Sequence, residues 1–123
     1  MFTFKSPANP KHIWTLCFRD QDMMQRIFYE HRTPEEGVKI HGITEYETST
    51  IYIDKGLDGF PLAKALRHEL THIYLWETGQ QAREYTEEEL CDIMSTGGVA
   101  IIKSVAEILL RLKEGFYKNG KED

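Results

Sequence analysis

The segment from Leu62 to Glu77 constrains the fold most, because its apolar residues are distributed almost all round a helix. Such a helix requires other elements to cover most of its surface, so it belongs at the centre of a protein. Pro61 suits a first helical turn, Asp58 can cap the helix before it, and Gly79 can end it. The sequence therefore predicts a central and largely buried helix.

This helix contains the pattern H-E-x-x-H, formed by His68, Glu69 and His72. Successive helical residues are about 100° apart, so the two histidines lie about 40° apart on one helix face and can bind the same small cation. Glu69 projects beside that cation rather than onto it. Chance alone would give roughly 0.02 matches in a chain of this composition, which favours a metal site over two purely structural histidines. The pair borders the one clearly polar stripe of the helix, where a cleft would open, formed by Lys64, Arg67, Thr71 and Thr78.

A third metal ligand is expected near the start of the next predicted helix, because two histidines leave a zinc site incomplete. Thr86-Glu87-Glu88-Glu89 has the pattern of a capping box, in which the Glu89 side chain turns back to the Thr86 amide. This leaves Glu88 to bind zinc, with Asp92 on the same face to orient a ligand, and Glu89 is the second choice. The competing interpretation is that the three glutamates complement the helix dipole and face water. It is supported by the apolar stripe of this helix, which points away from Glu88 and consists of Leu90, Met94, Ile101, Val105, Ile108 and Leu112.

The remaining patterns predict a single α+β domain over residues 1–123. Alternating β-branched and aromatic residues predict strands, and apolar residues at a helical period predict helices. In chain order we expect an irregular lead-in at 1–12, a strand at 12–18, a helix at 20–29, a hairpin of strands 38–46 and 50–54, the helix 62–77, a helix over 86–112 and a frayed tail at 118–123. Gly97 and Gly98 indicate either a bend that makes the last helix a helix pair, or a neighbour packed very close. The hairpin belongs to a small antiparallel sheet packed on the motif helix.

The composition argues against several classes of function. A net charge of −5 offers no basic face for nucleic-acid phosphates. Cys17 and Cys91 lack C-x-x-C spacing, so we expect two buried free thiols in a reducing cytoplasm. The N-terminal residues lack the apolar core of a signal peptide, and no uninterrupted apolar run reaches about 18 residues. We therefore expect a cytoplasmic protein without membrane or nucleic-acid partners, whose oligomeric state the sequence leaves open.

The sequence H-E-L-T-H at 68–72, followed by E-x-x-C-D at 88–92, resembles the gluzincin arrangement of H-E-x-x-H with a downstream E-x-x-x-D. In its compact form it is similar to the ImmA/IrrE-like metallopeptidases and related short proteins of phages, prophages and conjugative elements. Residues 42–95 fit their layout, in which a hairpin precedes the motif helix. Two positions depart from it, because Thr71 stands where the family has a small residue and Cys91 where alanine is common. The resemblance implies a compact zincin-like domain, a minimal gluzincin.

The resemblance also implies a zinc-dependent peptidase that hydrolyses a peptide bond in a protein substrate. Zn²⁺ would be held by His68, His72 and Glu88, and Glu69 would take a proton from the attacking water. The alternative is a catalytically silent module, with or without metal, that binds a regulatory protein. A third interpretation is a metal-free protein in which the motif is fortuitous. The intact Glu69 favours the enzyme, because a structural zinc site needs no glutamate at that position.

Overall fold

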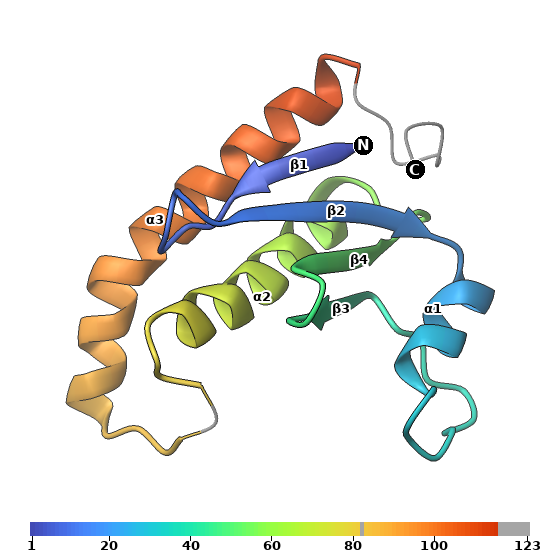
Figure 1. Ribbon diagram of the computed structural model, residues 1–123, viewed down its shortest axis with the longest axis horizontal. Helices are drawn as coiled ribbons and strands as arrows, with labels where there is room; N and C mark the ends of the chain where they lie inside the picture. The colour runs from blue at the N-terminus through green and yellow to red at the C-terminus, as the bar shows by residue number, and fades with distance from the viewer. Residues whose placement is uncertain (82, 116–123) are drawn as a thin grey trace.

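The computed structural model describes residues 1–81 and 83–115 and is an α+β domain (Figure 1). Its elements in chain order are β1 (Phe2–Lys5), β2 (Ile13–Arg19), α1 (Gln21–Phe28), β3 (Gly42–Glu45), β4 (Thr50–Asp54), α2 (Gly59–Glu77) and α3 (Glu87–Lys113). The strands form one sheet in the order β1-β2-β4-β3. The α+β prediction is therefore confirmed, together with the hairpin and the two long helices.

The sheet is mixed, whereas the sequence predicted an antiparallel one. β1 and β2 are antiparallel, as are β3 and β4, but β2 and β4 run parallel. The cause is the connection between them, because α1 and β3 lie between β2 and β4 in the chain and carry it back before β4 begins. β4 then pairs with β2 and leaves β3 at the edge of the sheet.

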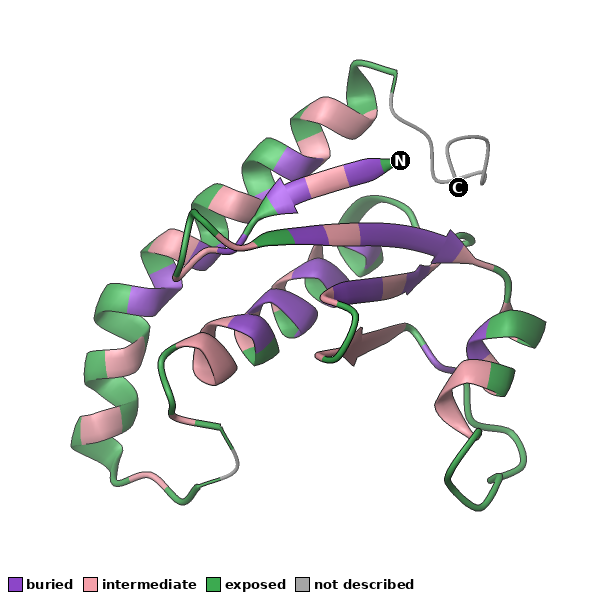
Figure 2. Cartoon of the chain, in the orientation of Figure 1, coloured by how far each residue is buried: buried purple, intermediate pink, exposed green. Residues whose placement is uncertain are grey.

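One face of the sheet carries the hydrophobic core. In register, Leu16 of β2 lies beside Ile51 of β4, and Phe18 lies beside Ile53. All four side chains are buried, because alternate residues of a strand point to the same face. Figure 2 shows that buried residues dominate β2, β4 and one side of α2. α2 and α3 supply the rest of this core through Leu62, Ala65, Leu66, Leu70, Ile73, Ile101, Val105 and Ile108.

α2 is the predicted central helix. It begins after Asp58, whose side chain accepts a hydrogen bond from the Gly59 amide, and its C-cap residue is Thr78. Gly79 follows with φ of 70°, a backbone conformation that suits glycine at the end of a helix. The residues that cap and end the helix therefore predicted its bounds well, since 62–77 was expected and Gly59–Glu77 is observed.

α3 is one continuous helix, so the two glycines do not divide it into a helix pair. A Cβ atom at Gly97 would lie 2.6 Å from the ring of Tyr74 in α2, too close for any side chain. The glycine is thus explained by close packing between α2 and α3, the second of the two expected alternatives. At its start, Thr86 and Glu89 form the predicted capping box.

By length and composition, α3 is the one helix in the described part of the chain that could cross a membrane. Its apolar run is not uninterrupted, because Lys103 and Glu107 lie within it. One stripe of α3 belongs to the core. Its remaining apolar surface is exposed at Leu90, Met94, Val99, Ile102 and Leu110.

Three further expectations were wrong. The first residues are not irregular throughout, because β1 pairs with β2 and buries Phe2 and Phe4. β3 is shorter than predicted, because the Gln21 side chain donates to the Ile40 carbonyl and accepts from the Ile40 amide, and these contacts hold the preceding segment against α1. Cys91 is exposed rather than buried. The tail at 118–123 lies outside the described residues.

Candidate functional site

The two motif histidines face each other on α2. Nε2 of His68 lies 3.2 Å from Nε2 of His72, one helical turn away. Zinc–nitrogen bonds of 2.0 to 2.1 Å at a tetrahedral angle would place two ligand nitrogens about 3.3 to 3.4 Å apart. The pair therefore has the spacing of two ligands on one metal ion, and the His68 side chain is 66% exposed, which opens this position to solvent.

The surroundings of His72 favour its neutral form. Burial lowers the pKa of its imidazole below the ordinary value, and the nearby charge of His68 lowers that pKa further. A neutral imidazole is the form that binds a metal ion, since its ring nitrogen must offer a free electron pair. The donor chemistry of this pair thus suits zinc at neutral pH.

Glu69 is the one buried carboxyl residue in the described part of the chain, with 5% of its surface exposed. Its Oε1 accepts a 2.8 Å hydrogen bond from the Thr44 hydroxyl, and its Oε2 lies 4.0 Å from Nε2 of His68. Burial raises the pKa of this carboxyl, while the Thr44 hydrogen bond and the His68 charge act in the opposite direction. A buried carboxyl with a raised pKa beside a histidine is typical of a catalytic site.

Edge strand β3 explains how a carboxylate can lie here. In register, Thr44 lies beside Ile51 and Gly42 beside Ile53. Because Ile51 and Ile53 are buried in the core, Thr44 and Gly42 also occupy positions on the core face, at the edge of the sheet. A Cβ atom at Gly42 would lie 2.6 Å from Oε2 of Glu69. β3 therefore supplies a hydroxyl to one oxygen of Glu69 and space for the other. Neither residue was predicted from the sequence, although a glycine inside a strand can mark a close approach.

A cavity of about 500 Å³ opens beside this group. His68 and Glu69 form part of its wall, together with residues of α1, of the segment before β3 and of the first half of α2. Its volume lies within the range that is common for binding sites of small molecules. The motif therefore borders a cleft, as its position beside the polar stripe of α2 predicted.

Among the described residues, the structure does not bring a third ligand to the histidine pair. Over residues 1–81 and 83–115, no group of three His, Cys, Asp or Glu side chains lies close enough to hold a metal ion. Glu88 is exposed in the first turn of α3, which begins beyond the C-terminal end of α2 (Figure 1). Glu89 is engaged in the capping box and in an ion pair with Arg83. The assignment of Glu88 as third ligand stays a prediction.

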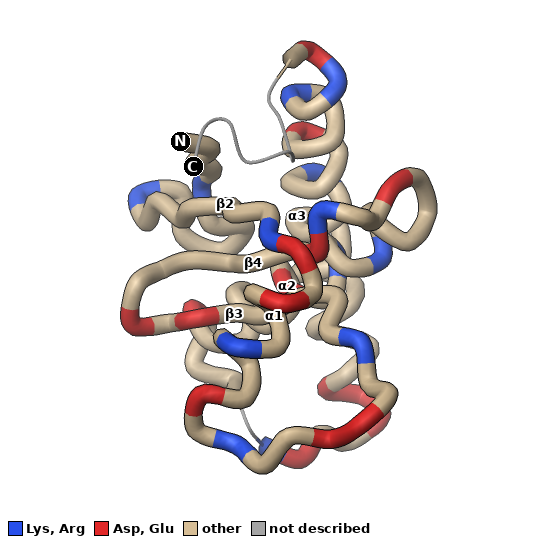
Figure 3. Tube along the Cα trace, turned by 90° about the vertical axis from the view of Figure 1, so that its right-hand side faces the viewer, with Lys and Arg blue, Asp and Glu red and all other residues tan. Residues whose placement is uncertain are grey.

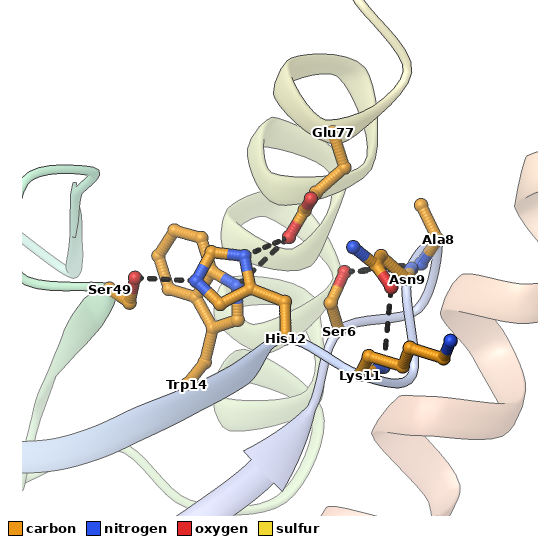
Figure 4. A network of polar contacts seen from close by, with 8 residues as sticks. All are labelled: Ser6, Ala8, Asn9, Lys11, His12, Trp14, Ser49 and Glu77. Atoms are coloured by element: carbon orange, nitrogen blue, oxygen red, sulfur yellow. Dashed lines mark hydrogen bonds and ion pairs between the residues drawn. The ribbon is translucent and has the colours of Figure 1, made fainter.

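A second contact between a histidine and a glutamate lies at the C-terminal end of α2 (Figure 4). Nδ1 of His12 lies 2.6 Å from Oε1 of Glu77, and its Nε2 lies 2.7 Å from the Ser49 hydroxyl. The Trp14 indole N–H donates to the same Oε1 of Glu77 at 3.3 Å. The His12 ring also packs against Trp76. This network joins the start of β2, the β3–β4 turn and the end of α2.

In comparisons with protein-family models, curated proteins and solved structures, nothing matches this chain.

Proposed function

We propose that this protein is a zinc-dependent peptidase of the gluzincin type, with a minimal zincin-like fold, that cleaves a peptide bond in a protein substrate. The observation that carries the proposal is the arrangement of His68, His72 and Glu69. Two imidazole nitrogens face each other at 3.2 Å, and a buried carboxylate lies beside them at the edge of a cavity. Gly42 and Thr44 of β3 support this carboxylate, the first by leaving space for Oε2 and the second by donating to Oε1.

His68 and His72 would hold the metal, and Glu88 is the proposed third ligand. When bound, zinc supplies a Lewis acid that lowers the pKa of water and polarises a carbonyl group. The exposure of His68 keeps this position accessible to a substrate from the solvent side. The lowered pKa of His72 keeps its nitrogen available to the metal at neutral pH.

Glu69 would act as general base and then as general acid. Because Thr44 donates to Oε1, Oε2 is the oxygen free to accept a proton from the attacking water. It is also the oxygen that lies nearer His68. The same carboxyl then returns the proton to the leaving nitrogen. The raised pKa assists both steps, since proton transfer is most efficient when the pKa of the catalytic group approaches the working pH.

The alternative function is a catalytically silent module that binds a regulatory protein. The cavity beside the motif supports it, because an apolar wall can hold a partner's side chain whether or not a bond is cut. Glu69→Gln separates the two functions. The variant should bind the partner or substrate in either case. If the parent is a peptidase, the variant should no longer hydrolyse the substrate.

The test is metal content, measured by plasma mass spectrometry on protein purified without added zinc or a histidine tag. The parent and Glu69→Gln should both hold close to one zinc per chain, and His68→Ala should lose it. Glu88→Ala and Glu89→Ala form the matched pair that identifies the third ligand. A parent that holds no metal, even after zinc is offered and the excess removed, would rule out the peptidase.

A further inference from the structure

The wall of the cavity beside the motif is mostly apolar. The apolar lining residues are Phe28, Ile40, Leu57, Phe60, Pro61 and Ala65. Ile40 and Ala65 are buried, while Phe60 is 71% exposed, so apolar surface continues from the floor of the cavity to its mouth. Exposed aromatic surface at the mouth of an apolar cavity is typical of a binding site rather than of core packing.

The rim of the cavity is basic, although the chain as a whole is acidic. Lys39 and Lys64 line it and are exposed, whereas Glu69 is the one acidic residue among the described residues that line it. The guanidinium carbon of Arg67 lies 5.6 Å from the centre of the Phe60 ring, which adds a third positive charge near the mouth. Figure 3 shows acidic and basic positions spread over the whole trace. Such a rim attracts and orients a negatively charged group.

We propose that this cavity is the specificity pocket of the site, and that it binds a large apolar side chain of an extended peptide whose neighbouring residue is acidic. The apolar side chain fills the cavity, and the acidic side chain pairs with Lys39 or Lys64 at the rim. This inference rests on the proposed function for the cleavage of the peptide, but not for its binding.

The position of β3 favours an extended peptide as the occupant. Among the described strands, β3 pairs with β4 alone, so its outer edge offers backbone groups to a further strand. Gly42, its first residue, also lines the cavity. A peptide that pairs with this edge would therefore bring a side chain to the cavity while its backbone passes Glu69.

The test measures binding of fluorescently labelled, C-terminally amidated pentapeptides to Glu69→Gln protein by anisotropy. Four peptides combine Phe or Ser at the central position with Glu or Lys at the next one. The Phe–Glu peptide should bind most tightly. Exchange of Phe for Ser should weaken binding about 10- to 100-fold, the effect of withholding a large apolar side chain from burial. Exchange of Glu for Lys should weaken it about 2- to 5-fold, an effect that shrinks at high salt.

Two variants locate the binding to this cavity. Lys64→Glu should reverse the preference between the Phe–Glu and Phe–Lys peptides, and Phe60→Ala should lower the affinity for both. Lys103→Glu, an exposed charge reversal on α3, is the matched control and should change neither. Equal binding of the Phe and Ser peptides would overturn the proposal. If the parent binds no zinc but the protein still discriminates between the peptides, the proposed pocket is supported and the proposed peptidase function is ruled out.

Discussion

α2 contributes to two clusters of histidine and glutamate side chains. The two clusters contain the same residue types but differ in the contacts that these residues make. At the C-terminal end of α2, both ring nitrogens of His12 have partners, and one oxygen of Glu77 accepts from His12 and Trp14. In the middle of α2, His68 and His72 turn their nitrogens toward each other at 3.2 Å. The first arrangement joins side chains from three segments of the chain, whereas the second is a contact between two histidines of one helix beside a cavity.

The two glutamates differ as well. One oxygen of Glu77 accepts from two side chains outside α2. Glu69 is buried with one hydrogen bond from Thr44, and burial dominates its raised pKa. Because the pKa of Glu69 is raised in the folded state, its contribution to stability is full below the unfolded pKa of about 4.3 and is lost as pH rises through the folded pKa. Its ionisation in the folded state thus costs stability, as is common for residues placed for function.

The largest expected effect is the loss of activity in Glu69→Gln. Without its proton-accepting carboxylate, kcat/KM should fall by about 10² to 10⁴, while zinc content is kept. The amide cannot ionise, and its oxygen can still accept from Thr44. The free energy of unfolding at pH 8, measured with urea, should therefore equal or exceed that of the parent. A clear loss of stability at pH 8 would place Glu69 with Glu77 among the structural carboxylates.

Gly42→Ala should have the next largest effect, because the added Cβ atom would come within 2.6 Å of Oε2 of Glu69. We expect Glu69 to be displaced and kcat/KM to fall up to about 10²-fold, as small misplacements of catalytic groups can do. Overpacking should also cost about 1 to 3 kcal/mol of stability. Gly56→Ala, in the turn after β4, is the control and should keep full activity. Unchanged kcat/KM in Gly42→Ala would show that the position of Glu69 is irrelevant to catalysis.

Glu77→Ala tests whether the cluster at the C-terminal end of α2 is structural. The change leaves the Trp14 indole N–H and a His12 nitrogen without their acceptor, which should cost about 2 kcal/mol in the free energy of unfolding. Zinc content should stay at the parental level, because Glu77 makes its contacts with His12 and Trp14 and none with the motif histidines is among its described contacts. Urea denaturation measures the first effect and mass spectrometry the second. Glu47→Ala, at an exposed turn position, provides the baseline for loss of a carboxylate. Loss of zinc in Glu77→Ala would contradict the separation of the two sites.

The sequence predicted the parts of this comparison that depend on local pattern. The helical spacing of His68 and His72 and the end signals of α2 lie within one segment, so they could be read directly from it. Gly42, Thr44 and Glu77 acquire their roles through strand register and through contacts between residues that are distant in the chain. The position of Glu88 relative to the histidines depends on how α3 packs against α2, which the pattern of either helix alone does not determine.

The smallest expected effect is that of Thr44→Val, which removes the hydroxyl while it keeps a β-branched side chain on β3. The hydrogen bond from Thr44 lowers the pKa of Glu69, so its loss should raise that pKa further. The acidic limb of the profile of kcat/KM against pH should then move to higher pH, because Glu69 must be ionised to accept a proton. Stability should fall by about 1 kcal/mol, the net value of one hydrogen bond. Thr48→Val, on the β3–β4 turn, is the matched control and should leave the profile in place. If the acidic limb stays fixed in Thr44→Val, the group that titrates there is not Glu69, and the distinction between the two glutamates of α2 loses its catalytic meaning.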